Sequence, residues 1–303
     1  MSLIGRSLMF FQIDIKNVTE WPHELRYLRV LESLTVNQIQ FPHLDINAFH
    51  GFEKTLKSLT LESSKLEKVP YAICNLSQLS SFDFRYNYHL QETKSSIFEP
   101  CGNKLLNVGS FYIAANNLNT FPDMFSLFPS LTYISAVANR HQYIDDTKIP
   151  FDSNVTGIHL SANMFDRIPY ALNRMNRLTH VYLSQNRITT IEKPDLSNLT
   201  ALTLLYLNGN PIKYIAVDAF KKNNIELSYL NLQNTHLDHV PTAVSSLAKL
   251  STFILSGMPV DCTCDMSYLK HWNVSAVSTF TTKCAYTSET VKSFVMNSLQ
   301  TCP

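Results

Sequence analysis

The strongest constraint on the fold is a short apolar phrase that recurs along most of the chain. The phrase reads L-x-x-L-x-L-x-x-N-x-L, and the step between its opening residues is 23 to 25 residues, apart from one step of 29. Such a period indicates a solenoid, because each copy is too small to bury its own apolar edge and has to stack on its neighbours. The eleven openers are Leu8, Leu31, Leu56, Leu79, Val108, Leu131, Val155, Leu178, Leu202, Leu227 and Leu250.

Each copy predicts one short strand followed by a turn. Side chains alternate along a strand, so the residues two, four and six positions after each opener share one face. Apolar-Pro pairs such as Trp21-Pro22 and Val69-Pro70 follow, and because Pro cannot donate to a strand ladder, the strand has to end before them. We expect helix beyond the prolines to be short or absent.

An asparagine stands eight residues after the opener in six consecutive copies. A side-chain amide at this position can bond backbone groups that stacking removes from water, so we assign these residues a structural role. They are Asn87, Asn116, Asn139, Asn163, Asn186 and Asn210.

The two most regular copies, opened by Leu178 and Leu202, match the leucine-rich repeat at every defining position. Residues 8 to about 260 therefore resemble a leucine-rich-repeat protein. The resemblance implies an α/β solenoid, mostly β and irregular, in the form of a horseshoe of about eleven repeats with a parallel sheet on its concave side. We assign residues 1–257 to the solenoid and residues 258–303 to a C-terminal cap.

Four of the six cysteines cluster after the last copy, with Leu269 and Trp272 between them. This stretch resembles the cysteine-rich cap of extracellular leucine-rich-repeat domains of the Toll-like and Slit-like type. The resemblance implies a first-to-third and second-to-fourth pairing and places Leu269 and Trp272 in the core of a cap helix. The implied bridges are Cys262–Cys284 and Cys264–Cys302.

The remaining cysteines, Cys74 and Cys101, lie in the return segments of consecutive copies and could meet as a third bridge. A zinc site in the cap is disfavoured, because Cys284 and Cys302 stand far apart and no close histidine pair follows them. Six paired cysteines indicate an oxidising, extracellular compartment.

Five N-x-[ST] sequons also point to a secreted glycoprotein, since this tripeptide is the acceptor for N-glycosylation. They begin at Asn17, Asn75, Asn154, Asn198 and Asn273. Neither a signal peptide nor an N-terminal cysteine cap precedes Leu8, which predicts that the N-terminus is truncated. The sequence holds no apolar run of the roughly 20 residues that a membrane span needs.

Aromatic residues gather on the expected concave face from the fifth copy onward, whereas the earlier copies place Ser, Thr, Glu62, Asp83 and Arg85 there. Neighbouring strands lie about 4.8 Å apart, so we expect one contiguous patch. Two interpretations stay open: a protein-binding surface, or rings that stack only to stabilise the strands. The patch comprises Tyr112, Tyr133, His159, His180, Tyr182, Leu204, Tyr206 and Tyr229.

Other functions find little support in the sequence. The formal charge of +1 gives no phosphate-tracking stripe, and no nucleic-acid partner is expected. His159 or His180 could pair with Ser161 or Ser184 for hydrolysis, but G-x-S-x-G is absent. We expect no enzyme, no cofactor and no resident metal, although the two histidines on adjacent strands could bind a metal or make binding sensitive to pH.

The sequence therefore predicts an extracellular protein-binding module that uses its concave face. It could serve as a receptor ectodomain, a secreted ligand-binder or a non-catalytic partner subunit. The segment Phe98–Leu105, F-E-P-C-G-N-K-L, resembles arthropod leucine-rich-repeat proteins grouped with the non-catalytic subunit of a secreted luciferase. The alternative is an adhesion protein that self-associates, as a homodimer, through the same face.

Overall fold

The computed structural model describes residues 7–90, 97–98, 101–102, 104–220, 226–258 and 260–302. The chain divides into two compact units. The first unit consists of Met1–His141 with Ser153–Val155, and the second of Gln142–Asp152 with Thr156–Pro303. The expected division into a solenoid and a cap at residue 257 stays a prediction.

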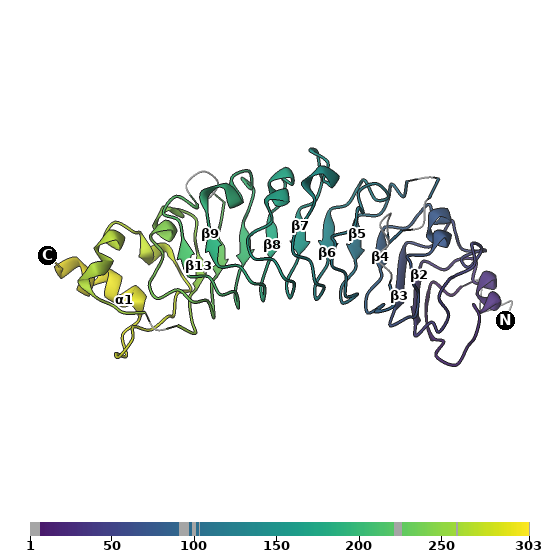
Figure 1. The fold of residues 1–303 in the computed structure, drawn as a ribbon, viewed down its shortest axis with the longest axis horizontal. Helices are drawn as coiled ribbons and strands as arrows, with labels where there is room; N and C mark the ends of the chain where they lie inside the picture. Colours follow the sequence, from purple (N-terminus) through teal and green to yellow (C-terminus); the bar gives the residue numbers. More distant parts are fainter. Residues whose placement is uncertain are drawn as a thin grey trace. The chain divides into compact units, whose positions relative to one another are not determined.

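In the first unit each repeat contributes one strand to a parallel sheet, and the strands pair in the order of the sequence (Figure 1). The register follows the repeat, since Ser33, Ser58, Ser81 and Ser110, each two residues after an opener, lie side by side. The strands are β1 (Phe10–Asp14), β2 (Ser33–Asn37), β3 (Ser58–Glu62), β4 (Ser81–Asp83), β5 (Ser110–Tyr112) and β6 (Tyr133–Ser135).

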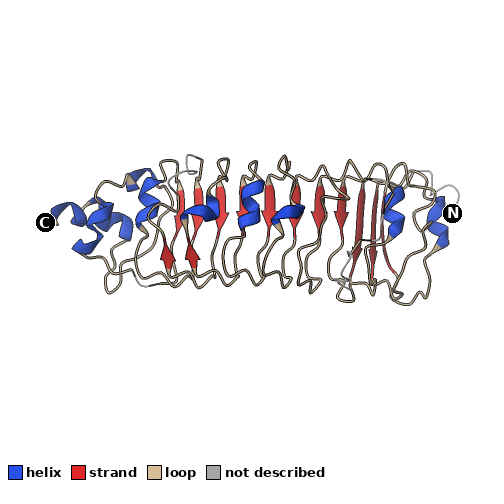
Figure 2. Cartoon of the chain, turned by 45° about the horizontal axis from the view of Figure 1, so that its top comes forward, coloured by secondary structure: helices blue, strands red, loops and turns tan. Residues whose placement is uncertain are grey.

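The second unit continues the pattern with parallel strands in the same register (Figure 2). Its strands are β7 (Gly157–His159), β8 (His180–Tyr182), β10 (Leu204–Tyr206), β12 (Tyr229–Asn231) and β13 (Thr252–Ile254). A separate pair, β9 (Thr190–Ile191) and β11 (Tyr214–Ile215), adds a two-stranded parallel sheet that the repeat phrase did not predict. The expected solenoid of leucine-rich-repeat type is confirmed.

The return segments carry only short helical turns, as expected. Four of the 3₁₀ helices start directly after a proline, at Pro22, Pro70, Pro169 and Pro241; proline fixes φ near the helical value and has no N–H to leave unsatisfied there. The 3₁₀ helices are η2 (His23–Tyr27), η3 (Tyr71–Asn75), η4 (Asp146–Lys148), η5 (Tyr170–Arg174), η6 (Lys193–Leu196), η7 (Thr242–Ser246), η8 (Cys264–Leu269), η9 (Val274–Ala276) and η10 (Ser298–Thr301), and the α-helix is α1 (Val291–Met296).

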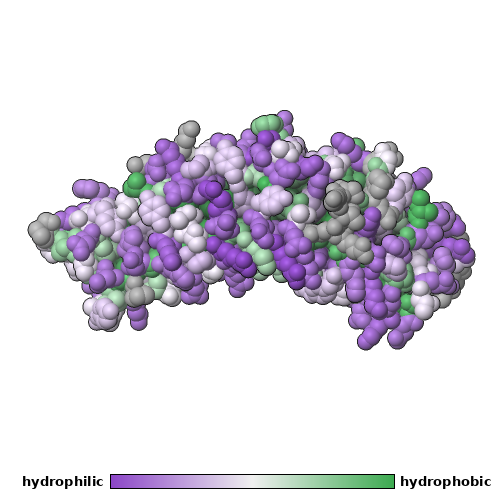
Figure 3. Space-filling model, in the orientation of Figure 1, coloured by the Kyte–Doolittle hydropathy of each residue, from purple (hydrophilic) through white to green (hydrophobic). Residues whose placement is uncertain are grey.

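Alternate strand residues point into the core of each unit. In the first unit the rings of Phe82, Phe111 and Phe128 pack together with centroids 5.1 to 6.3 Å apart. In the second unit Leu178, Val181, Leu183 and Ile188 of one repeat are all fully buried. On the face drawn in Figure 3 hydrophilic residues dominate, and apolar residues appear as small separate patches.

The six repeat asparagines are all buried. Bonds to backbone groups of an adjacent repeat, as predicted, are made by Asn87, Asn116, Asn139, Asn186 and Asn210. In the first unit the backbone N–H of Asn87 donates to Oδ1 of Asn116 over 2.7 Å, and Nδ2 of Asn116 donates to the carbonyl of Phe84 over 2.7 Å. In the second unit Ile188 N–H donates to Oδ1 of Asn210 over 3.1 Å. These amides satisfy backbone groups that the short strands leave without a ladder partner.

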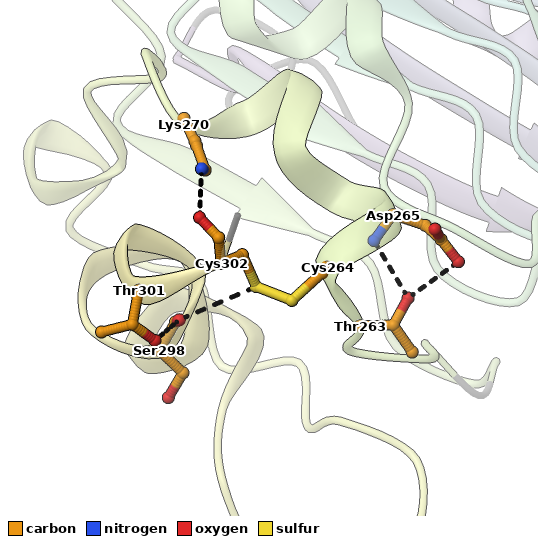
Figure 4. Close-up of a disulfide and its surroundings, with 7 residues drawn as sticks. All are labelled: Thr263, Cys264, Asp265, Lys270, Ser298, Thr301 and Cys302. Carbon is orange, nitrogen blue, oxygen red and sulfur yellow. Dashed lines mark hydrogen bonds between the residues drawn. A yellow bond between two sulfur atoms is a disulfide. The ribbon is translucent and has the colours of Figure 1, made fainter.

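Three disulfides are present, and they join the same pairs that the sequence suggested: Cys74–Cys101, Cys262–Cys284 and Cys264–Cys302. In the cap, Lys270 Nζ donates to the carbonyl of Cys302 over 2.7 Å beside the last bridge (Figure 4). Leu269 and Trp272 are buried, but the turn η8 ends at Leu269, so Trp272 lies beyond the expected helix. Trp272 instead packs on Phe253 of β13, with ring centroids 6.2 Å apart.

Candidate functional site

The outward sheet face, expected to be the concave one, is built from the residues two and four positions after each opener. In both units its side chains alternate with the buried ones, such as Leu59 in β3 and Leu205 in β10. The eight predicted site residues all lie on this face. Tyr112 and Tyr133 belong to the first unit and the other six to the second. His180 is exposed and the remaining seven are half-buried, so the rings do not pack into the core.

Four rings of the second unit form a continuous series, which we call the ring ladder: His159, Tyr182, Tyr206 and Tyr229. Successive ring centroids are 4.8, 5.1 and 4.8 Å apart, close to the spacing of the strands that carry them. His159 pairs with Tyr182 in the strand register, and Tyr182 pairs with Tyr206. Tyr229 joins diagonally, because its register partner is Leu204.

The geometry of the ring ladder decides what it offers to a ligand. The planes of Tyr182 and Tyr206 are only 20° apart, so their faces largely cover each other. Edges and hydroxyl groups are therefore the parts left for solvent or a partner. A hydrogen bond between Tyr206 and Tyr229 is the main reason that the pKa of Tyr206 is raised to about 12, so the phenol stays protonated. The three tyrosines of the ring ladder thus carry neighbouring hydroxyl groups, and that of Tyr206 is neutral.

In the first unit the two predicted aromatic residues also meet. The rings of Tyr112 and Tyr133 lie 5.6 Å apart at 46°, although Tyr112 pairs in register with Ser135 and Tyr133 with Ser110. They touch diagonally across one strand step. Rings of the predicted patch thus meet within each unit, while the single contiguous patch of eight residues stays a prediction.

The two histidines on adjacent strands are not register partners. His180 lies opposite Gly157 in the register, while Tyr182 occupies the place beside His159. His180 Nδ1 is 2.7 Å from the hydroxyl of Thr179. Among the described residues there is also no cluster of three or more His, Cys, Asp or Glu side chains able to hold a metal ion.

His159 is instead held within its own strand end. Its Nε2 lies 3.1 Å from Oγ of Ser161, and burial lowers its pKa from the usual 6.5, so the ring is neutral near pH 7. Ser161 is only 8% exposed, which keeps its hydroxyl away from any substrate. Ser184 donates its hydroxyl to Oδ1 of Asn208 over 2.7 Å. Both serines are thus placed as structural polar groups.

Sequence reasoning named the charges of the first unit but not their arrangement. Arg85 bonds Glu62 Oε2 through Nε over 3.1 Å and Asp83 Oδ2 through Nη2 over 2.9 Å. Asp83 is 9% exposed, and its Oδ1 has no hydrogen-bond partner. Burial raises the pKa of Asp83 to about 6, against the opposing effect of the Arg85 charge. The charge of this Glu62–Asp83–Arg85 cluster therefore changes in mild acid, when Asp83 takes up a proton.

All five sequon asparagines are exposed, and so are the Ser or Thr residues two positions after them. None lies in a strand. Asn75 is the last residue of η3, and Asn273 precedes η9. The sequons therefore leave the outward sheet face of each unit uncovered.

Comparison with known proteins agrees with the fold. The family described as "Leucine rich repeat" matches residues 153–212, which contain the repeat phrases opened by Leu178 and Leu202. The chain has the leucine-rich-repeat fold. Among curated relatives, this leucine-rich-repeat chain is 25% identical over 226 residues to podocan-like protein 1 of Mus musculus, covering 65% of the chain and 39% of that protein. The chain thus matches less than half the length of this relative.

Solved structures agree with the leucine-rich-repeat fold at low sequence identity. An internalin of Listeria monocytogenes has a TM-score of 0.68 at 17% identity and covers 100% of this chain and 88% of its own. The Toll–Spätzle complex of Drosophila has a TM-score of 0.65 at 17% identity, covering 83% and 35%. A TLR13–ssRNA13 complex has a TM-score of 0.58 at 19% identity, covering 78% and 41%. At these identities the likeness concerns the fold alone.

Leucine-rich-repeat proteins commonly bind other macromolecules, and the fold and family are typically non-enzymatic. Within the described part of this leucine-rich-repeat chain, no helix has the length and apolar character to cross a membrane. The Phe98–Leu105 motif falls partly outside the described residues, which include neither residues 99–100 nor residue 103.

Proposed function

We propose that the chain is an extracellular, non-catalytic module that binds a protein partner through the ring ladder of its second unit. The observation that carries this proposal is the ring ladder itself: four aromatic side chains that are half-buried on a sheet face. Tyrosine supplies a large contact area with few rotatable bonds and a polar end, which is why it is enriched in protein interfaces.

The alternative role of the rings, stacking that only stabilises the strands, accounts for part of their geometry. Cross-strand aromatic pairs contribute about 0.2 to 1 kcal/mol each. Stacking alone does not require tyrosine, however, because phenylalanine stacks equally well without a hydroxyl to hydrate. Three of the four rings keep hydroxyl groups at the outward face, which supports a surface that presents hydrogen-bonding groups to a partner.

Three disulfides and five exposed sequons support an extracellular setting, since both features belong to the secretory route. The structure of Toll with Spätzle gives a precedent for this fold in complex with a protein, and that of TLR13 with ssRNA13 a precedent for RNA. The near-neutral charge of the present chain favours protein as the partner.

The test compares two double variants as immobilised baits in extracellular fluid of the source organism. Tyr182→Ala with Tyr206→Ala removes the centre of the ring ladder. Tyr214→Ala with Tyr286→Ala removes two exposed tyrosines from other places and serves as the matched control. We expect the first variant to lose a partner that the wild type and the control retain, with an unfolding temperature within a few degrees of wild type, because the rings add only about 1 kcal/mol to stability.

Two results would contradict the proposal. Unfolding of the ladder variant would assign the rings to stability alone. Capture of single-stranded RNA in place of a protein would change the class of partner.

A second candidate function is self-association through the same outward face, as in an adhesion protein. The ladder presents an exposed edge of neutral hydroxyls that two copies could share in an isologous contact. Sedimentation over a range of protein concentrations separates the two functions. A dimer that dissociates on dilution and is lost in the Tyr182→Ala, Tyr206→Ala variant would favour adhesion, whereas a monomer at all concentrations favours binding of another protein.

A further inference from the structure

A pocket of about 480 Å³ opens on the helical side of the second unit, on elements that do not carry the ring ladder. Its walls come from η4, η5 and the segment that follows η6. The lining residues that matter are Phe151, Tyr170, Asn173, Arg174, Asn198 and Thr200. Its volume lies within the usual range for ligand sites, about 300 to 1,000 Å³.

Two of these residues belong to a sequon. Asn198 and Thr200 are the first and third residues of Asn198-Leu199-Thr200, and both are exposed in the pocket wall. The backbone N–H of Asn198 donates to Oδ1 of Asn173 over 2.8 Å. Asn173 is 5% exposed, and its Nδ2 donates to the carbonyls of Pro194 and Asp195 over 3.2 Å. The backbone of the sequon at Asn198 is therefore anchored to a buried amide.

The same pocket holds two unusually exposed aromatic rings. Phe151 is 73% and Tyr170 is 59% exposed, and both line this pocket. The Arg174 guanidinium lies 4.4 Å from the centroid of the Phe151 ring and bonds Asp146 Oδ2 over 3.1 Å through Nε. The pocket thus combines aromatic surface, a neutralised arginine and side-chain amides.

We propose that this pocket seats the first N-acetylglucosamine residues of an N-linked glycan carried by Asn198. A pyranose ring has an apolar face of C–H bonds that packs on aromatic rings, and its acetamide and hydroxyl groups can bond to the exposed amide of Asn176 in the pocket wall. The proposal rests on the proposed extracellular function, because N-glycosylation takes place on the secretory route. The proposal assigns to the Asn198 sequon a glycan, the pocket that holds its first sugars, and the aromatic residues that contact them.

The covalent step is the usual transfer from a lipid-diphosphate-linked oligosaccharide. A bond forms between Nδ2 of Asn198 and the anomeric carbon of the sugar, the amide loses one proton, and the lipid diphosphate departs with the bonding electrons. The transferase of the secretory route supplies the donor. Thr200 completes the acceptor tripeptide. The pocket acts afterwards, by holding the attached sugar against Tyr170 and Phe151.

The chain offers a control within itself, because the other sequons carry their asparagines at other exposed places. Asn17 follows β1 in the first unit, and Asn273 precedes η9 in the second. A glycan seated in a pocket is protected from enzymes that cut between its first two sugars, whereas a glycan on open surface is not. Asn273 is therefore the reference for an unprotected position in the same unit.

The experiment starts with the whole chain secreted from a glycosylating cell line, and peptide mass spectrometry reports the occupancy of each sequon. Native protein is then treated with an endoglycosidase that cuts between the first two N-acetylglucosamines. We expect Asn198 to be occupied and its glycan to be cut at least about tenfold more slowly than that at Asn273, which corresponds to about 1.4 kcal/mol of docking.

The variant Phe151→Ala with Tyr170→Ala should leave occupancy unchanged and remove the protection at Asn198. The exposed pair Tyr214→Ala with Tyr286→Ala should leave the protection intact. If the pocket variant is not secreted, the single change Tyr170→Ser tests the same contact. Free N,N'-diacetylchitobiose added to the non-glycosylated Thr200→Ala protein should bind weakly and shift the signals of Tyr170.

An unoccupied Asn198 beside occupied sequons elsewhere, or an Asn198 glycan cut as fast as that at Asn273, overturns this inference and leaves the proposed function standing. A protein that is never secreted and carries no glycan at any sequon overturns both. The partner-capture experiment on the ring ladder is independent of this pocket, so failure of one proposal is distinguishable from failure of the other.

Discussion

At the scale of single residues, one backbone position per repeat sets the turn out of the strand. The residue seven positions after the opener has a φ between +54° and +85° in every repeat from the second to the last. Glycine adopts this left-handed region freely, whereas other residues lose about 1 to 2 kcal/mol there. Only two of the ten are glycines; the ten are Gln38, Ser63, Tyr86, Ala115, Ala138, Ala162, Gln185, Gly209, Asn234 and Gly257.

Gly257 should tolerate substitution least among these turn residues. A Cβ at this position would lie 1.9 Å from Oδ1 of Asn234 in the preceding repeat, in addition to the strain of a φ of +85°. At Gly209 the nearest atom to a Cβ is 3.3 Å away, on the flexible side chain of Gln185. We therefore expect Gly257→Ala to lower the free energy of unfolding by about 2 kcal/mol or more, and Gly209→Ala by about 1 kcal/mol.

Denaturant unfolding of the two glycine variants measures this difference. Equal losses in both would mean that the backbone angle alone, and not the approach of Asn234, governs the cost.

Asp83 predicts a pH dependence of stability in the first unit. Its native pKa of about 6 lies above the usual 3.8, because burial disfavours the charged form. Between these two values the folded chain binds more protons than the unfolded chain, so the stability from this group falls as the pH rises from about 4 to 6. Asp83→Asn removes the buried charge and can still accept from Arg85. We expect the variant to unfold at a higher temperature than wild type at pH 7.

The difference between Asp83→Asn and wild type should shrink as the pH falls through about 6 and vanish well below 3.8, where both states of the wild-type residue are protonated. Calorimetry at a series of pH values tests this. A constant difference across the series would show that the carboxylate is not destabilised by its surroundings.

At the scale of elements, the repeat phrase was sufficient to place the strands. Every strand of the 11-stranded sheet begins two residues after a predicted opener, because the alternation of Leu and Val with polar residues fixes which face is buried. The prolines instead mark the starts of four 3₁₀ turns, well beyond the strand ends, because a residue with a fixed φ and no N–H suits the start of a helical turn. The asparagines were assigned correctly because one amide side chain offers two donor hydrogens and an acceptor oxygen.

Other local features left no sequence signal. The left-handed turn is filled by Ala, Gln, Ser or Tyr as well as Gly, so residue type does not reveal its φ. The β9–β11 pair depends on two adjacent return segments having the same shape. His159 stands four residues after its opener and His180 two residues after its own, so the two are not register partners. Membership in the aromatic set alone does not reveal this difference. Phe151 and Asn198 line the same pocket, but nothing in the sequence predicts that these distant residues lie close together.

The asparagine ladder yields a prediction for the second unit. Asn186 accepts from the N–H of Phe165 over 3.1 Å and donates to the carbonyls of Leu160 and Leu183 over 3.0 Å each. Asn186→Ala leaves these buried groups unsatisfied, at a cost of about 1 to 3 kcal/mol for each. We expect a loss of at least about 2 kcal/mol in the free energy of unfolding.

The matched control for Asn186→Ala is Asn208→Ala. Asn208 is half-buried at the outward face and accepts one hydroxyl, that of Ser184. Its removal should cost well under half as much. A similar loss in both variants would indicate that Asn186 is not specifically holding the backbone of the adjacent repeat.

At the scale of the whole molecule, the ring ladder predicts how binding responds to pH. Burial lowers the pKa of His159 below 6.5, so its ring is neutral throughout the range above that value. Protonation then adds a positive charge beside Tyr182 only in mild acid. We expect affinity for the captured partner to be nearly constant above pH 6.5 and to change only in more acidic solution. In His159→Gln the change should disappear, and a titration centred above pH 6.5 would assign it to another group.

The disulfides give the last prediction, because they act on the unfolded chain. Cys264–Cys302 closes a segment with a sequence separation of 38, and Cys74–Cys101 closes one of 27. Loops of these lengths correspond to a loss of unfolded-state entropy of roughly 3 to 4 kcal/mol each. Cys264→Ser with Cys302→Ser should therefore lower the free energy of unfolding by about that amount, measured by denaturant titration. A loss below about 1 kcal/mol would show that packing, and not the bridge, keeps the cap closed.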